Sequence, residues 1–149
     1  MSGEPPGRRV DARRLWAGGL ATAVVAALVA VAGVLVARGV FDTAVLAPQG
    51  DGVWGNANTP KYALSAAVAA LVATALLHIL VTTTPRPGRF FTWVMVLLTA
   101  IVAALPLTLD LAGPSAVATS IINIVIGTAI LSTLIGVART AVRRPHRKP

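Results

Sequence analysis

The sequence predicts an all-α integral membrane protein: a four-helix bundle of antiparallel, up-and-down transmembrane spans with both termini in the cytoplasm. The first observation is a set of four long apolar runs in a chain of 149 residues. A run of ~20 apolar residues is enough to cross the ~30 Å hydrocarbon core of a bilayer. The second observation is that only 12% of the residues are charged, against about 25% in a soluble domain. The third is that the basic residues lie at the ends of the apolar runs.

The first predicted span is Leu15 to Ala37, which contains no charged residue. The segment 1–14 before it is basic, polar and contains Pro and Gly, so we expect it to be disordered. A cleaved signal peptide is the alternative, but the apolar region of a signal peptide has only ~7–15 residues. The greater length of this run, and the lack of a small-x-small cleavage site after it, favour an uncleaved span.

Small residues recur along the first span with alternating spacings of four and three. They are Gly19, Ala23, Ala26, Ala30, Gly33 and Ala37. This alternation matches the a and d positions of a left-handed helix pair, where small residues let two backbones approach closely in lipid. The second span repeats it at Ala63, Ala66, Ala70 and Ala73. We therefore expect the first two spans to pack together, although an alanine-rich helix also produces such a pattern by chance.

The longest predicted connection is an outer loop at residues 38–61, which is interrupted by Pro and several Gly residues. Apolar residues between these turns indicate that the loop lies in the headgroup region or folds over the helix ends. Trp54 is well suited to the interface because it has an apolar body and one N–H. Asp51-Gly52 is placed to close a short hairpin between Val45-Leu46 and Val53-Trp54.

The remaining predicted spans are 62–81, 90–109 and 116–138. A tight turn with two Pro and two Arg residues precedes the third span. Phe90, Phe91 and Trp93 follow that turn, and we expect them to form an aromatic belt at the membrane interface.

The distribution of Lys and Arg predicts the orientation. Of the 13 basic residues, all except Arg38 and Lys61 fall in segment 1–14, in the turn before the third span, or in a basic tail at 139–149. Basic residues next to spans tend to stay in the cytoplasm, so we expect a multi-pass protein of the plasma membrane with both termini inside. The net charge of +8 then reflects topology and not nucleic-acid binding. The bilayer is the expected partner, and the tail can attract anionic lipids.

Polar residues inside the spans are where a functional site would be expected, and His78 is one of two candidates. It is predicted near the cytoplasmic edge, ~24 Å from Tyr62 along the second span. The simpler interpretation is a neutral imidazole that is hydrogen-bonded to a backbone carbonyl or to Thr82. The functional alternative is a proton acceptor or pH sensor, but no carboxylate is expected at its depth.

Asn123 is the second candidate, predicted ~10 Å below the outer surface in the fourth span. Pro106 in the third span removes an N–H and frees the carbonyl of Val102, which is predicted at a similar depth. We expect the Asn123 amide to donate to that carbonyl, with Gly127 allowing the two helices to come close. A contact with a substrate or ion is the alternative. On another face of this span, small residues at 128, 132 and 136 serve either a subunit contact or no contact.

Three stretches resemble a known family: APQGDGVWG in the outer loop, PRPGRFFTW at the start of the third span, and INIVIG around Asn123. The family is a group of uncharacterised small four-span membrane proteins of high-GC actinobacteria, classed only as a domain of unknown function. The resemblance covers roughly Arg14 to Val142. It implies a four-span integral membrane protein without a known activity, and it carries no catalytic residues over.

The function best supported by the sequence is a non-catalytic structural, accessory or interaction protein that forms homo-oligomers or binds another membrane protein. The alternative is a subunit of an oligomeric transporter or channel for ions or small solutes. We expect no enzyme, because the sequence has no nucleophile–base pair and no phosphate-binding loop in a suitable context. No cofactor or metal site is expected either, and the chain has no cysteine.

Overall fold

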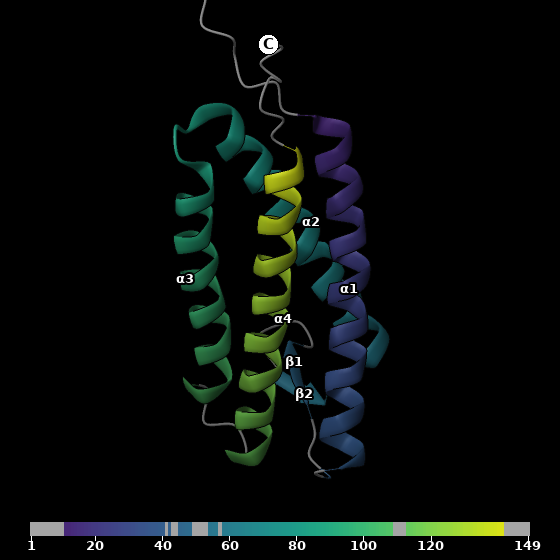
Figure 1. Cartoon of the computed structure of the whole chain (residues 1–149). Coiled ribbons are helices and arrows are strands. Elements are labelled where there is room, and N and C mark those ends of the chain that lie inside the picture. The colour runs from purple at the N-terminus through teal and green to yellow at the C-terminus, as the bar shows by residue number, and fades with distance from the viewer. Residues whose placement is uncertain are drawn as a thin grey trace, which may run out of the picture.

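The computed structural model describes residues 11–40, 42, 45–48, 54–56, 58–108 and 113–141. Its elements are α1 (Ala12–Gly39), β1 (Leu46–Pro48), β2 (Trp54–Asn56), α2 (Thr59–Thr83), α3 (Pro87–Thr108) and α4 (Gly113–Ala141). The four helices run up and down in one antiparallel bundle, and the two short strands lie toward the end opposite the start of α1 and the end of α4 (Figure 1). The predicted four-helix architecture is therefore confirmed, with a small hairpin added to it.

The helices form a ring in the order α1, α2, α3, α4. The closest packing is between α1 and α2, followed by α3 with α4 and α1 with α4, whereas α2 and α3 contact each other much less. The start of α1 and the end of α4 are in contact: the N–H of Asp11 donates to the carbonyl of Ala141 at 3.3 Å. The two terminal helix ends therefore lie on the same side of the bundle.

Many large apolar side chains lie on the outer surface of the bundle, while many of the buried side chains are small. All four helices are long and apolar enough to cross a membrane. On α1, the side chains of Leu20 and Leu28 are about 60% exposed, whereas Ala26 and Ala30 are fully buried. A soluble monomeric protein rarely exposes a continuous apolar surface of this kind to water. The distribution identifies a multi-pass membrane protein.

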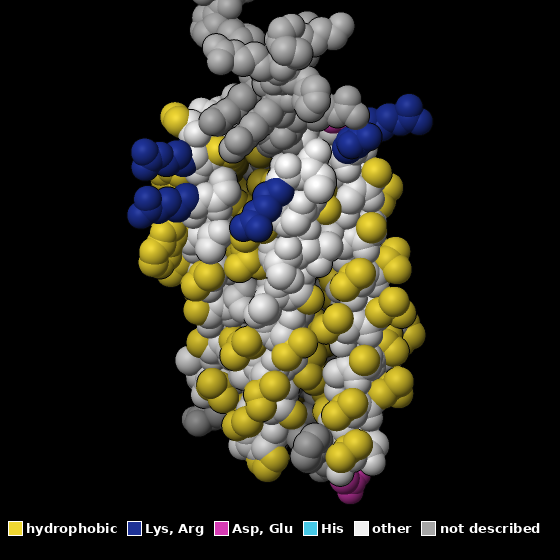
Figure 2. All heavy atoms as spheres, viewed as in Figure 1, with side chains coloured by type: hydrophobic (Ala, Val, Ile, Leu, Met, Phe, Trp, Pro, Cys, Tyr) yellow, Lys and Arg dark blue, Asp and Glu magenta, His cyan; other side chains and the backbone are white. Residues whose placement is uncertain are grey.

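Charged side chains lie at the ends of the bundle. On the face shown in Figure 2, the Lys and Arg side chains gather toward the end where α1 begins and α4 ends, and yellow hydrophobic side chains are spread along the length below them. This arrangement agrees with the clustering of basic residues that the sequence predicts at one side of the membrane.

The first helix begins earlier than expected. Asp11 is its N-cap, and its carboxylate accepts the N–H of Arg14 at 3.2 Å and pairs with the Arg14 Nε at 3.4 Å. An Asp side chain at this position satisfies one of the unpaired N–H groups of the first turn. Arg13 and Arg14 are thus helical, which corrects the boundary of the segment 1–14. Residues 1–10 and 142–149, with most of the basic tail, lie outside the described residues.

The small residues of α1 are positioned for close helix contact. Five of the six are buried, and a Cβ at Gly19 would collide with the side chain of Thr74 in α2. Gly33 differs from the expectation, because its Cβ would lie 2.9 Å from Ile122 Cγ2 in α4. The alternating spacing of four and three places these residues on one stripe of the helix, but it does not determine which neighbouring helix each of them faces. α1 therefore uses small residues against both α2 and α4.

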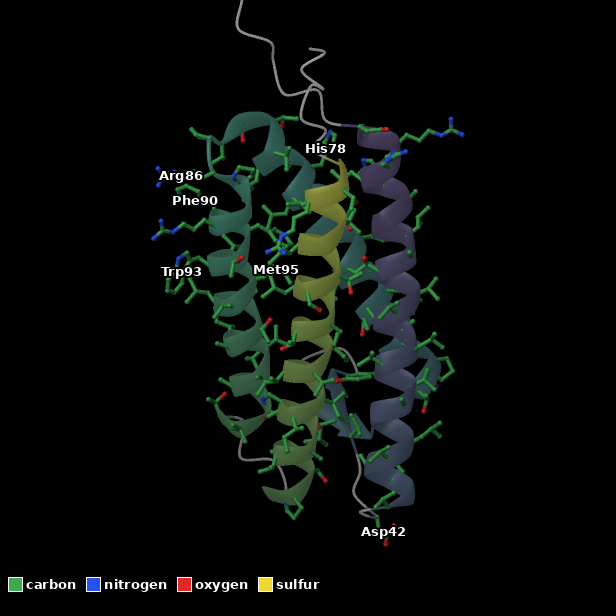
Figure 3. The ribbon with its side chains drawn as sticks, viewed as in Figure 1. Asp42, His78, Arg86, Phe90, Trp93 and Met95 are labelled. Atoms are coloured by element: carbon green, nitrogen blue, oxygen red, sulfur yellow. The ribbon has the colours of Figure 1, made fainter. Side chains whose placement is uncertain are left out.

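The aromatic residues of α3 divide between two faces. Phe90 and Trp93 are 58% and 62% exposed, and they point away from the bundle (Figure 3). Phe91 is fully buried, and Met95, one turn later, is also buried and points toward α4 (Figure 3). The exposed Phe90 and Trp93 remain available for the predicted aromatic belt, whereas the buried Phe91 cannot belong to it, because burial depends on the helix face as well as on depth.

The described parts of the predicted outer loop form a short hairpin next to α4. β1 pairs with β2 in antiparallel register, with Leu46 opposite Asn56 and Pro48 opposite Trp54. Val45 is fully buried, and the N–H of Leu46 donates to the hydroxyl of Thr119 in α4 at 2.9 Å. The expected hairpin is present, although the turn at Asp51-Gly52 and the Trp54 side chain lie outside the described atoms.

Replacing Thr119 with Val should release this hairpin. The substitution keeps the shape but leaves the Leu46 N–H without its acceptor, at a cost of about 1–3 kcal/mol for an unpaired buried donor. We expect faster amide hydrogen exchange at Leu46, with little change in the exchange of the four helices. If hydrogen exchange at Leu46 were unchanged, the Thr119 hydroxyl would not be holding the hairpin against α4.

Candidate functional site

The candidate site is a polar contact between helices that is centred on Asn123 of α4. Its Nδ2 donates to the carbonyl of Val102 in α3 at 3.2 Å, which is the bond expected from the sequence. The hydroxyl of Tyr62 in α2 donates to Asn123 Oδ1 at 2.6 Å. One side chain therefore connects three of the four helices.

The orientation of the Asn123 amide follows from its neighbours. The carbonyl of Val102 can only accept, so the nitrogen of the amide must face it. The oxygen then faces Tyr62, whose hydroxyl must donate its single proton to it. One N–H of Asn123 and the lone pairs of the Tyr62 oxygen remain without a partner among the described residues.

Pro106 explains why α3 accepts the bond from Asn123. Proline has no N–H, so the carbonyl of Val102 loses its partner inside the helix and is available to Asn123. One residue further along, the carbonyl of Ala103 lies 2.6 Å from the hydroxyl of Ser120 in α4. Ser120 was not predicted. Its position three residues before Asn123, on the same face of the helix, was the signal that could have identified it.

A glycine brings α3 and α4 together beside this contact. A Cβ at Gly127 would collide with the side chain of Thr99, so the helices approach closely at this level. This position agrees with the role expected for Gly127. The Thr99 hydroxyl itself makes no hydrogen bond among the described residues.

The polar contact lies at one end of a cleft between α2 and α3, the neighbouring helices with the least contact. The cleft has a volume of about 290 Å³ and opens toward the lipid-facing surface. Its polar members are Tyr62, Ser65, Thr99 and Asn123. Its apolar members are Ala66, Ala69, Val72, Ala73, Leu76, Met95, Leu98, Val102, Ile126 and Ile130, and Gly127 also lines it. The cleft thus has one polar end and apolar walls.

His78 does not belong to this site. It lies on α2 toward the end of the bundle where α1 begins and α4 ends (Figure 3), ~24 Å along the helix from Tyr62. The hydroxyl of Thr82 donates to the backbone carbonyls of His78 and Ile79, at 3.2 and 2.8 Å, and not to the imidazole. The His78 Nδ1 is buried without a hydrogen bond in the described part of the chain, so the expected partners are absent there.

The other polar side chains of the spans mostly satisfy themselves. The buried Thr22 and Thr74 donate to the carbonyls of Gly18 and Ala70, one turn earlier in their own helices, at 2.8 Å each. On the lipid-facing side of α4, Thr128, Ser132 and Gly136 are exposed, and nothing lies within 4 Å of a Cβ built at Gly136. Among residues 11–40, 42, 45–48, 54–56, 58–108 and 113–141, no group of three His, Asp or Glu side chains is arranged to hold a metal ion.

A family model described as "Family of unknown function (DUF6069)" matches residues 10–140 of the chain. No curated protein matches the chain. No solved structure matches it either.

Proposed function

We infer that this chain, which belongs to the family of unknown function DUF6069, is a non-catalytic accessory or structural protein of the plasma membrane. It acts through contacts of its helix faces with lipid and with other membrane proteins or further copies of itself. Both termini face the cytoplasm, and the basic residues at that side attract anionic lipids.

The observation that carries the proposal is how the polar groups of the spans are used. The Asn123 amide and the Ser120 hydroxyl bond to backbone carbonyls of α3, and Tyr62 bonds to Asn123. A transport path or a catalytic centre needs polar or ionisable groups directed toward a solute or substrate. Here the strongest hydrogen-bonding side chains hold helices together instead.

Flux through reconstituted vesicles tests this function. The purified chain is inserted into liposomes, and proton and potassium fluxes are recorded with an internal pH dye and a potassium electrode. We expect fluxes equal to those of protein-free liposomes. A flux that the parent chain supports and His78→Ala abolishes would overturn the non-catalytic proposal in favour of transport.

One observation favours the alternative, a subunit of an oligomeric channel or transporter. Thr128 and Ser132 expose hydroxyl groups on the lipid-facing side of α4, and several copies arranged around this face would line a polar path. Cross-linking in native membranes discriminates between the two functions. A closed ring of copies would favour the channel, whereas a dimer or a complex with a different membrane protein supports the accessory role.

The proposed orientation predicts the behaviour of reporter fusions. Alkaline phosphatase, which is active only outside the cytoplasm, should be inactive after residue 149 and active when inserted in the outer loop after Asn58. The matched fusion in the turn after Pro85 should be inactive. The proposed orientation rests on the tendency of basic residues near spans to stay in the cytoplasm. Activity of the C-terminal fusion would contradict it.

A further inference from the structure

We propose that the cleft between α2 and α3 binds an uncharged lipophilic molecule that carries a carbonyl oxygen and enters sideways from the bilayer. This inference goes beyond the proposed accessory role, which rests on the hydrogen bonds between helices, and the two share Asn123, whose second N–H those bonds leave free among the described residues. The proposal follows from the size of the cleft, its lack of charge and the donors at its polar end.

The size of the cleft limits the ligand. An apolar cavity of ~150 Å³ stays dry and holds a benzene molecule. The cleft has a volume of about 290 Å³, so it accommodates a molecule or a segment about twice as large. Ala69 and Val72 of α2 face this space across from Leu98 of α3, and they are matched to an apolar body.

The walls also determine the charge of the ligand. No Lys, Arg, Asp, Glu or His side chain is among the described residues that line the cleft. A charged group would lose its hydration there without gaining a partner of opposite charge, which is strongly unfavourable. The ligand is therefore neutral.

The polar end of the cleft supplies hydrogen-bond donors that have no acceptor. Asn123 has one N–H beyond the one that it gives to Val102, and the hydroxyl of Thr99 makes no bond among the described residues. In hydrocarbon such donors are costly unless something accepts from them. A carbonyl oxygen accepts without bringing a further donor into the cleft, which a hydroxyl or an amide would do.

Two sources share this chemistry: a quinone dissolved in the bilayer, and the acyl ester of an uncharged membrane lipid. Menadione and methyl decanoate represent them and have the same number of non-hydrogen atoms. Undecane is the apolar control without an acceptor. The readout is the thermal unfolding midpoint of the full chain in maltoside micelles, titrated with each probe, because a ligand that binds only the folded state raises it.

We expect the midpoint to rise with at least one carbonyl probe and undecane to bind about twofold to tenfold more weakly, the ratio of one hydrogen bond. Ala69→Phe, at an exposed position in the cleft, should remove the response. Ala32→Phe, at an exposed position in the apolar groove between α1 and α4, should retain it. Asn123→Ala combined with Tyr62→Phe should narrow the difference between methyl decanoate and undecane, because the Thr99 hydroxyl is then the one free donor left among the described residues of the cleft.

Each outcome decides the proposal. A response to menadione alone assigns the cleft to a quinone ring, a response to methyl decanoate alone assigns it to an acyl ester, and a response to both supports the shared chemistry. The proposal is overturned if neither carbonyl probe raises the midpoint. It is also overturned if Ala69→Phe responds like the parent chain, or if undecane binds as tightly as the carbonyl probes.

Discussion

Gly19→Ala should destabilise the bundle by about 1–3 kcal/mol, the usual cost of forcing an extra carbon atom into a well-packed interior. The new Cβ would lie 2.9 Å from Thr74 Cβ and closer still to the two atoms beyond it. Thr74 cannot rotate away freely. Its side chain is fully buried, and its hydroxyl donates to the Ala70 carbonyl at 2.8 Å. The backbones of α1 and α2 must therefore separate.

Gly136→Ala is the matched control. No atom lies within 4 Å of a Cβ at this position in α4, and alanine favours a helix over glycine by roughly 0.5–1 kcal/mol. We expect the control to be neutral or slightly stabilising when unfolding is titrated with SDS in mixed micelles. Equal destabilisation by the two substitutions would show that the contact between Gly19 and Thr74 does not determine the packing of α1.

Gly127→Ala should have an intermediate effect. Its Cβ would meet Thr99 of α3, which is only partly buried and has no hydrogen bond to lose among the described residues. Thr99 can therefore turn aside at a lower cost than Thr74. The same SDS titration should rank the three substitutions in the order Gly19, Gly127, Gly136.

The sequence predicts the fold well because lipid restricts the chain so strongly. Only helices and closed barrels satisfy the backbone in hydrocarbon, so long apolar runs specify the number of helices. Short connections then specify an antiparallel arrangement of neighbours. The start of α1 was missed although Asp11 has the side chain of a typical N-cap, because the basic residues after it also suited a disordered segment.

The candidate site was partly predictable. The bond from Asn123 to Val102 follows from two features of the sequence, a proline four residues after the carbonyl and an amide at the same depth. The bond to Tyr62 does not follow, because it depends on the rotation and vertical offset of α2 relative to α4. Hydrophobic patterns restrict those quantities only weakly when nearly every residue is apolar.

The burial of Phe91 is a second case in which the sequence does not determine the rotation of a helix. Phe91 and Met95 are four residues apart and share a helix face, and both are buried. Their spacing was visible in the sequence. The apolar residues on every side of α3 gave no reason to choose that face over the one that carries Phe90 and Trp93. In a membrane helix the direction of the core must come from small and polar residues, which are few in α3.

Asn123→Ala should lower the free energy of unfolding by about 1–3 kcal/mol. The substitution removes one bond to α2 and one to α3, and side-chain hydrogen bonds in membrane proteins average ~0.6 kcal/mol, with a maximum near 1.7 kcal/mol. It also leaves the Tyr62 O–H and the Val102 carbonyl without partners in a cleft open to lipid, which adds to the cost. SDS titration in mixed micelles measures the effect.

Thr128→Val is the control for the loss of a hydroxyl group in lipid. Thr128 is exposed on α4 and makes no hydrogen bond among the described residues, so its replacement should change stability by less than about 0.5 kcal/mol. If Asn123→Ala were equally mild, the amide would not hold α2, α3 and α4 together.

A double-mutant cycle separates the bond to Tyr62 from the rest. Tyr62→Phe removes only the donor, and combining it with Asn123→Ala should cost less than the sum of the two single effects. The difference should be about 0.6–1.7 kcal/mol. Additive effects would show that the 2.6 Å contact between the Tyr62 hydroxyl and Asn123 Oδ1 contributes nothing to stability. The tie between α2 and α4 would then rest on apolar packing alone, and the Tyr62 hydroxyl would be free to bind a ligand in the cleft.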